Sequence, residues 1–471
     1  MDDTAESKQQ FDRGIVEGPL YRAVWKLAWP TMLANVIGGI QGIVDQAMVG
    51  YYVGHAGNAA IGVSMQVFML VIAFVASVFT GMGVLVARFA GAGDPDKVNR
   101  TVYQALLAAV FMSLGVLAPV GYYVAPFLLD MIKAAPEVQV EALSYIRIVF
   151  VFSIGMLIFF LMNGALRSAG DARTPLRLGI LMTGLNVVLN VVLIRGFGPI
   201  PAFGTMGAAM GSAISSGIVG CIFLVMLFSD RLVVRFSRTM SWLPDWVVIK
   251  ELFRFGLPTG FQGIAMNVAG VLLLRFIGSL EHSAEAQAAY AVGYTELFAL
   301  ITWTSVGLMG ATAAVAGQNL GAGYPERAAR SAQAAATIGL GVASVVGLMF
   351  VIFPRELLAI FSLDQGVAFD LGSGLLSYLA VSGFFVTIAL TYTGGLQGTG
   401  DTRSPLYISI VSQVVIPIGW CTFHSSFGGL QADDIWMAIV LGHMTRATLS
   451  VLRFRQGNWS NIVVNIDRKA S

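Results

Sequence analysis

Apolar residues fill the chain in long uninterrupted runs, and short polar stretches separate these runs. A helix needs about 20 apolar residues to cross a bilayer. Twelve runs reach that length, near 24–50, 59–86, 101–125, 143–166, 177–198, 207–229, 249–279, 286–316, 329–353, 373–396, 405–426 and 434–452. Strands of a membrane barrel would instead alternate apolar and polar residues over about ten positions. The pattern therefore predicts an all-α integral membrane protein with twelve transmembrane helices.

Composition supports the same class of protein. Of the 471 residues, 56% are hydrophobic and only 11% are charged, and the mean hydropathy is +0.76. A soluble globular chain carries about 25% charged residues. These values exclude a soluble protein and favour a multi-pass membrane protein.

Side chains that carry chemistry are scarce. The two cysteines, Cys221 and Cys421, lie inside apolar runs, so neither a disulfide framework nor a metal site is expected. The four histidines lack metal-ligand or catalytic spacing. The Gly-rich stretches 91–93 and 321–323 have no following Lys-Ser/Thr and are not phosphate loops. We therefore expect no enzyme, no cofactor, no nucleotide and no nucleic-acid partner, so that any transport draws on an ion gradient.

Basic residues gather in alternate loops, and this orients the predicted helices. Of the 28 Lys and Arg residues, 22 fall on the side that holds both termini, and Arg167 is among them. Three more lie within spans. The last three, Lys133, Arg195 and Arg355, fall on the opposite side. Because cytoplasmic loops carry the excess of Lys and Arg, we predict that both termini are cytoplasmic.

The chain repeats itself at a nearly constant offset. LRSAGDARTPL at 166–176 matches LQGTGDTRSPL at 396–406, and GAGDP at 91–95 matches GAGYP at 321–325, both 230 residues later. Six spans separate the repeats, so the halves share one orientation, and the axis between them runs along the membrane normal. Parallel repeats of this kind are typical of secondary transporters with the solute path between the halves. We predict two six-helix lobes, residues 1–229 and 249–471, joined by a cytoplasmic linker at 230–248.

The first run carries an acid where charge is costly. Asp45 lies inside the apolar stretch 27–54, and a charged side chain at the membrane centre costs about 2.5–3.5 kcal/mol. Asn35 and Asp45 share one helical stripe with two glycines, and Pro30 can bend the same helix because it removes a backbone hydrogen bond. These features predict that Asp45 is the cation-coupling residue of a moving helix. The alternative is that Asp45 only reaches the headgroup region.

Together these motifs resemble a known family. A Trp-Pro pair with Asp45 downstream, the Gly-Ala-Gly loops, and the Gly-Asp-x-Arg-x-Pro loops at 170–175 and 400–405 resemble the multidrug and toxic compound extrusion (MATE) family, in particular its DinF-like bacterial branch. The resemblance implies an antiporter that exports organic solutes, often cationic, against entry of protons or sodium. It also implies that the acid matching Asp45 couples the cation and that the proline matching Pro30 bends the first helix.

The same resemblance suggests partners for the acid. A supporting polar network is predicted from Asn35, Gln41, Asn186, Asn190 and Ser212. Some family members carry a second carboxylate where this chain has Asn190, and hard cations prefer charged oxygen ligands, so no tight sodium or other metal site is expected. The alternative is that these groups only form interhelical hydrogen bonds, which are weak in membranes.

A second acid lies in the other half. Glu296 is about 15 Å along the helix from the outer end of its span, and its repeat partner is Gln66. We predict that Glu296 binds a cationic substrate or carries a second proton, with a protonated structural role as the alternative.

These observations predict a cation-coupled antiporter that exports drugs or toxic compounds across the bacterial inner membrane. Protons fit better than sodium, because burial among Asn, Gly and aliphatic residues disfavours a charged carboxylate. The expected partners are organic solutes and the lipid bilayer, and we expect a monomer. The alternative function is a lipid-linked glycan flippase of the same superfamily, which would need a strongly cationic cavity.

Overall fold

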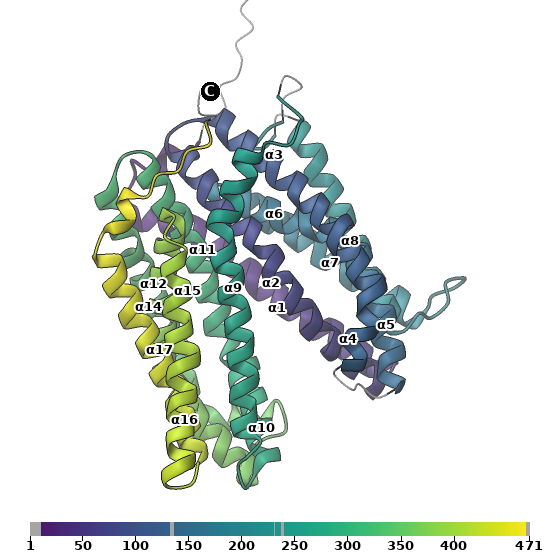
Figure 1. Cartoon of the computed structure of the whole chain (residues 1–471). Coiled ribbons are helices and arrows are strands. Elements are labelled where there is room, and N and C mark those ends of the chain that lie inside the picture. The colour runs from purple at the N-terminus through teal and green to yellow at the C-terminus, as the bar shows by residue number, and fades with distance from the viewer. Residues whose placement is uncertain (1–10, 132–135, 230, 237–239, 468–471) are drawn as a thin grey trace, which may run out of the picture.

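The computed structural model is a bundle of long helices in two groups (Figure 1). It describes residues 11–131, 136–229, 231–236 and 240–467, with the side chains of 69–74, 76 and 131 left out. Within these residues every element is a helix, apart from one isolated bridge between Phe197 and Ile200. The predicted all-α fold is confirmed.

The N-terminal group holds the first six spans. Its elements are η1 (Arg13–Ile15), α1 (Leu20–Tyr52), α2 (His55–Gly91), α3 (Pro95–Phe111), η2 (Met112–Leu117), η3 (Val120–Val124), α4 (Ala125–Met131), α5 (Pro136–Val151), α6 (Ile154–Ser168), α7 (Arg173–Arg195) and α8 (Thr205–Phe228). The short elements η2 and η3 are π-helical stretches that carry α3 on to α4 as one span.

The C-terminal group holds the other six. Its elements are α9 (Trp246–Ile277), α10 (Ser283–Tyr290), η4 (Ala291–Leu297), α11 (Ala299–Gly321), α12 (Pro325–Ile352), α13 (Pro354–Ala359), α14 (Gly366–Thr399), α15 (Arg403–Ser409), η5 (Ile410–Val415), α16 (Ile416–Phe427), α17 (Ala432–Arg455) and η6 (Asn458–Asn461). The π-helical stretches η4 and η5 join α10 to α11 and α15 to α16.

Helix length and hydropathy identify eleven spans among the described residues. Ten helical stretches are long and apolar enough to cross a membrane, and α5 and α6, bent by 55° where they meet, form an eleventh. The 37-residue α2 supplies the twelfth. Each of the twelve predicted runs therefore corresponds to one span.

The two lobes pack through equivalent helices. The first two spans of one lobe meet the first two spans of the other: α2 packs against α9, and α1 packs against α11. The same two-fold relation brings α2 and α11 together. The lobes lie close together at the end that holds the termini, and they diverge toward the opposite end (Figure 1).

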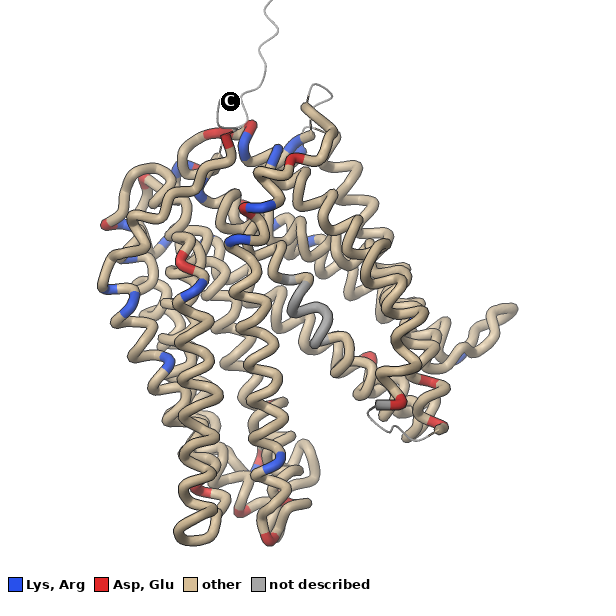
Figure 2. Tube along the Cα trace, viewed as in Figure 1, with Lys and Arg blue, Asp and Glu red and all other residues tan. Residues whose placement is uncertain are grey.

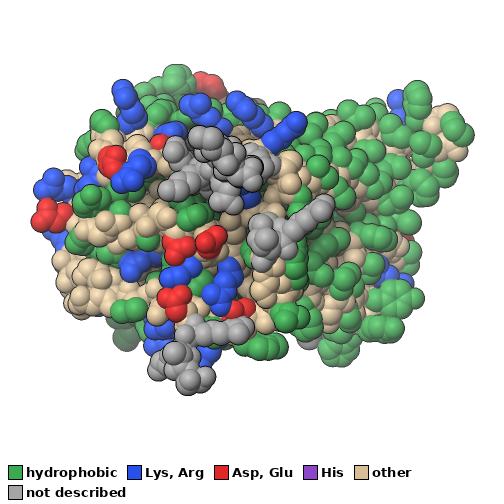
Figure 3. Space-filling view, turned by 90° about the horizontal axis from the view of Figure 1, so that it is seen from above, with side chains coloured by type: hydrophobic (Ala, Val, Ile, Leu, Met, Phe, Trp, Pro, Cys, Tyr) green, Lys and Arg blue, Asp and Glu red, His purple; other side chains and the backbone are tan. Residues whose placement is uncertain are grey.

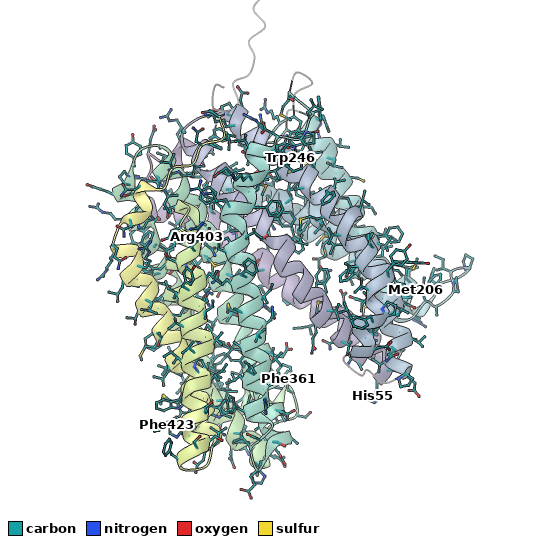
Figure 4. All side chains as sticks on the ribbon, in the orientation of Figure 1. His55, Met206, Trp246, Phe361, Arg403 and Phe423 are labelled. Atoms are coloured by element: carbon teal, nitrogen blue, oxygen red, sulfur yellow. The ribbon has the colours of Figure 1, made fainter. Side chains whose placement is uncertain are left out.

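Charge separates the two ends of the bundle. Lys and Arg concentrate at the end where the lobes meet, which we call the basic end, and acids dominate the far end (Figure 2). Seen onto the basic end, many Lys and Arg side chains spread over the surface (Figure 3). Trp246 lies toward this end, whereas His55, Phe361 and Phe423 lie toward the other (Figure 4). Five of the basic residues used in the prediction lie outside the described residues: Lys8, Lys133, Arg238, Arg468 and Lys469.

Each chain end crosses to the other lobe at the basic end. Near the N-terminus, the carbonyl of Ile15 accepts a hydrogen bond from Asn319 at 3.3 Å, and the carbonyl of Gly18 accepts one from Arg327 at 2.7 Å. Near the C-terminus, Arg88 donates to the carbonyl of Ile462 at 3.1 Å, and Ile466 is buried in the core of the N-terminal lobe. These reciprocal contacts hold the basic ends of the lobes together.

The segment between the lobes packs on the N-terminal lobe. Tyr103 of α3 donates to the carbonyl of Trp242 at 2.8 Å, and Gln104 donates to that of Leu243 at 2.9 Å. Asp245 caps α9 by accepting from the backbone of Val247. The described part of the segment is thus held in place against α3.

Candidate functional site

Asp45 sits where three helices of the N-terminal lobe meet. Its carboxylate lies on α1, and Asn190 on α7 donates a hydrogen bond to Oδ1 over 2.7 Å. Gln41, one turn earlier on α1, also hydrogen-bonds the carboxylate. Gln41 lies four residues before Asp45, so both side chains project from the same face of α1. Because α7 packs beside α1, Asn190 meets them there.

Asn186 links the acid to α8. Its side-chain amide lies 2.9 Å from Oδ1 of Asp45 and 3.1 Å from Oγ of Ser212. With the amide nitrogen toward Asp45, Asn186 donates to the carboxylate and accepts from Ser212, and it gives up the 3.3 Å hydrogen bond that its oxygen accepts from Asn190 in the other orientation. In the opposite orientation, the amide oxygen of Asn186 would lie against Oδ1 of Asp45, and two acceptors cannot form a hydrogen bond. We therefore assign the orientation with the nitrogen toward Asp45.

Two further residues belong to this site and were not predicted. Thr183 on α7 donates to Oε1 of Gln41 over 2.7 Å. The phenol of Tyr145 on α5 lies close enough to interact electrostatically with Asp45. Thr183 shares its helix face with Asn186 and Asn190, three and seven residues later, so helical periodicity could have identified it. Tyr145 comes from another span and carries no such signal.

Asn35 was wrongly placed in this network. Its amide donates to the backbone carbonyl of Trp303 on α11 over 3.1 Å, and so it contacts the other lobe. The spacing correctly placed Asn35 and Asp45 on one face of the helix. However, ten residues of helix rise separate them by about 15 Å, so the two side chains lie at different depths in the membrane.

Other predicted residues lie elsewhere. Pro30 is inside α1, which runs as one helix from Leu20 to Tyr52, so the proline does not interrupt the helix in this conformation. Gln66 is exposed on α2, and Glu296 is half-buried in η4 of the other lobe. Among the described residues, neither Gln66 nor Glu296 forms a side-chain hydrogen bond or an ion pair, so neither is bonded to the Asp45 network.

The groups around Asp45 are hydrogen-bond donors. Asn190, Asn186 and Gln41 turn N–H groups toward the carboxylate, whereas a cation site would turn oxygens inward. Within the described residues, no group of three or more His, Cys, Asp or Glu side chains is placed to hold a metal ion. The arrangement suits a carboxylate that exchanges a proton with its surroundings.

Gly211 on α8 makes room for Asn190. A Cβ at this position would lie 2.1 Å from Oδ1 of Asn190. Gly211→Ala should therefore push the amide away from Asp45 and lower ion-driven transport about tenfold, since hydrogen bonds to charged groups contribute about 1.5–3 kcal/mol. Transport into proteoliposomes measures this effect. Gly217→Ala on the same helix, where a Cβ meets nothing within 4 Å, should stay at the wild-type rate, and a wild-type rate for Gly211→Ala would contradict the role of Asn190.

A second feature lies between the lobes. A cavity of about 400 Å³, here called the axis cavity, is lined by α1, α2, α6, α11 and α14. Ten of its lining residues form five pairs at the repeat offset of 230: Phe79/Met309, Thr80/Gly310, Gly83/Ala313, Arg167/Gln397 and Ser168/Gly398. The pseudo-two-fold axis therefore passes through this cavity, which is where a path shared by both lobes must run.

Arg167 was assigned to the side that holds both termini, together with the basic loop residues. It belongs to the last turn of α6, and its guanidinium lines the axis cavity. The helix extends further than the apolar run suggests, which places this side chain inside the bundle.

Known proteins share this sequence and fold. The profile of the MatE family matches residues 30–192 and 258–421, one match in each lobe. A probable multidrug resistance protein NorM of Thermotoga maritima is 27% identical over 441 residues, covering 93% of each chain. A protein of the same name from Deinococcus radiodurans is 29% identical over 448 residues, covering 92% of this chain and 94% of its own. A solved structure described as the outward-facing conformation of a multidrug resistance MATE family transporter superposes with a TM-score of 0.86 at 22% identity, covering 97% of this chain and 98% of that one.

Proposed function

Since this chain belongs to the MATE family of membrane transporters, we propose that it is a proton-coupled antiporter that exports organic, drug-like solutes across the bacterial inner membrane. Its full-length similarity to multidrug resistance proteins supports the solute class. We further propose that the basic end is cytoplasmic, in line with the excess of Lys and Arg there. The assignment to the DinF-like branch remains a prediction.

The observation that carries the proposal is the position of Asp45 on a helix that serves both lobes. Toward its outer end, α1 is tied to its own lobe by the bond between Asp45 and Asn190. In its middle, α1 is tied to the other lobe by the bond between Asn35 and the carbonyl of Trp303. A change in the charge of Asp45 therefore acts on a helix that also forms part of the interface between the lobes.

Protonation would change the bonds at this site. A protonated carboxyl has an O–H to donate and attracts N–H donors less strongly than a carboxylate. Asn190 has a buried Oδ1 without a partner among the described residues, and a turn of its amide would present this oxygen as the acceptor. We propose that this exchange of hydrogen-bond partners changes how α1 packs against α7. Because α1 also contacts the other lobe, the change would shift the equilibrium between the inward-open and outward-open arrangements of the two lobes.

The remaining expectations extend this proposal. Glu296 would bind a cationic substrate or carry a second proton in the C-terminal lobe, and the working unit would be a monomer. A lipid-linked glycan flippase remains the alternative, but Arg167 is the single charged residue in the described lining of the axis cavity, which is therefore not strongly cationic.

Proteoliposomes with separately imposed ion gradients test the proposal. A proton gradient should drive uptake of a fluorescent drug-like dye, whereas a sodium gradient of equal size should not. Uptake that follows only the sodium gradient would contradict proton coupling, and uptake that follows neither gradient would contradict ion-coupled antiport.

A further inference from the structure

The guanidinium of Arg167 lacks a partner. It forms no hydrogen bond or ion pair with the rest of the chain in the part that the structure describes, and its Nε is fully buried and unsatisfied. A buried charge without a partner is costly, because it loses water and gains nothing in return. A ligand of opposite charge in the axis cavity would compensate this guanidinium.

The cavity is shaped around this side chain. On the facing lobe, a Cβ at Gly310 would lie 2.9 Å from Cζ of Arg167, so only glycine leaves the guanidinium its place. Asn163 and Gln397 add amides to the lining, while Phe160 and Met309 add apolar surface. A planar cation beside amides and apolar side chains suits an organic solute that bears a carboxylate.

The fold itself does not need a charge here. An arginine in the last turn of a helix can stabilise the helix dipole, which would be a purely structural role. However, Gln397 is the repeat partner of Arg167, occupies the equivalent position near the end of α14, and lines the same cavity without any charge. The two lobes therefore differ in charge at this position, with Arg167 on one side and Gln397 on the other. We relate this difference to the ligand of the cavity.

We propose that the axis cavity binds the carboxylate of the transported solute through Arg167, so that the preferred substrates are zwitterionic or anionic organic acids. This proposal rests on the proposed export function and specifies its substrate class. It differs from the expectation that substrates are mainly cationic, because the described cavity lining contains a cation and no acid.

A pair of dyes that differ only at the carboxylate tests the proposal. Rhodamine 110 has a free carboxylate, and rhodamine 123 is its methyl ester. Purified wild-type protein in detergent should bind rhodamine 110 about tenfold more tightly, as measured by fluorescence polarisation, because a charge-assisted bond contributes about that factor. Arg167→Gln, which copies the residue of the other lobe, should bind both dyes with equal affinity.

Two further variants control this result. Arg177→Gln removes the same charge from an exposed position one helix later and should keep the preference for rhodamine 110. Gly310→Ala keeps the charge but displaces the guanidinium, and it should reduce the preference even if Arg167→Gln folds poorly. Equal binding of the dyes by the wild type, no binding of rhodamine 110, or an unchanged preference in Arg167→Gln would overturn the proposal.

The binding test is independent of ion coupling. Asp45→Asn should retain the preference for rhodamine 110 in detergent while it loses gradient-driven uptake. Loss of the dye preference with intact proton-driven uptake of other solutes would refute the carboxylate site alone. Absence of gradient-driven uptake with an intact preference would refute the antiport mechanism alone.

Discussion

Asp45→Asn is expected to abolish gradient-driven export while leaving the protein folded. The substitution keeps the size of the side chain and its ability to hydrogen-bond Asn190 and Gln41. It fixes the charge at zero, so protonation can no longer distinguish the two conformations. A ligand shifts a conformational equilibrium only if it binds the two conformations with different affinities. In this variant no proton can bind at position 45, so protons can no longer favour one conformation through this residue.

The expected magnitude is large. Proton-driven uptake into proteoliposomes should fall at least about a hundredfold, and substrate affinity should lose its dependence on pH. Folding should not suffer, because removal of a charge from a membrane segment relieves a cost of about 2.5–3.5 kcal/mol. A monodisperse elution profile and a wild-type melting temperature in detergent check this.

Matched variants separate the charge from its position. Asp130→Asn makes the same chemical change at an exposed residue of α4 and should transport like the wild type. Asp45→Glu retains a titratable group and should keep part of the activity with a shifted pH profile. If Asp45→Asn exports solute at the wild-type rate under a proton gradient, coupling lies elsewhere, and Glu296 is the first alternative to examine.

The fold could be predicted because membrane helices and internal repeats leave long-range patterns. The length of each apolar run set the number of spans, and the offset of 230 between repeats predicted which helices would be equivalent. The same offset now pairs Arg167 with Gln397 and Thr80 with Gly310 across the axis cavity. Elements within a span were harder to predict, because the π-helical stretches and the 55° bend between α5 and α6 depend on tertiary packing.

The site could be predicted only where helical spacing determines contact. Asn186 and Asn190 share a face of α7 and both reach Asp45, as expected. Asn35 shares the face of Asp45 but not its depth, so it contacts Trp303 instead. Tyr145 could not be found in this way, since a contact between helices far apart in the chain leaves no local periodicity.

Gly91→Leu is expected to force the lobes apart at the basic end. Gly91 on α2 and Gly321 on α11 are repeat partners, and the helices cross there in backbone contact. A Cβ at Gly91 would lie 1.9 Å from the carbonyl oxygen of Gln318, and one at Gly321 would lie 2.0 Å from that of Arg88. Backbone cannot yield as a flexible side chain can, so any larger residue must separate α2 from α11.

The consequence for transport follows from the geometry. The lobes meet at the basic end and diverge at the other (Figure 1), and alternating access requires an arrangement with the opposite opening. Overpacking of about 1–3 kcal/mol at the crossing should favour that arrangement by about fivefold to a hundredfold. Export should fall by a similar factor, because the conformation seen here would become rare.

Spin labels at repeat-related positions can measure the separation. Asp96 and Glu326 are exposed residues at the starts of α3 and α12, and both can be replaced by Cys in a Cys221→Ser, Cys421→Ser background. Their distance distribution should shift to longer values in Gly91→Leu and, by symmetry, in Gly321→Leu. Gly270→Leu, where a Cβ meets nothing within 4 Å, should leave it unchanged. Wild-type distances together with wild-type transport in Gly91→Leu would mean that the crossing tolerates a side chain without opening, and alternation through separation of these helices would be wrong.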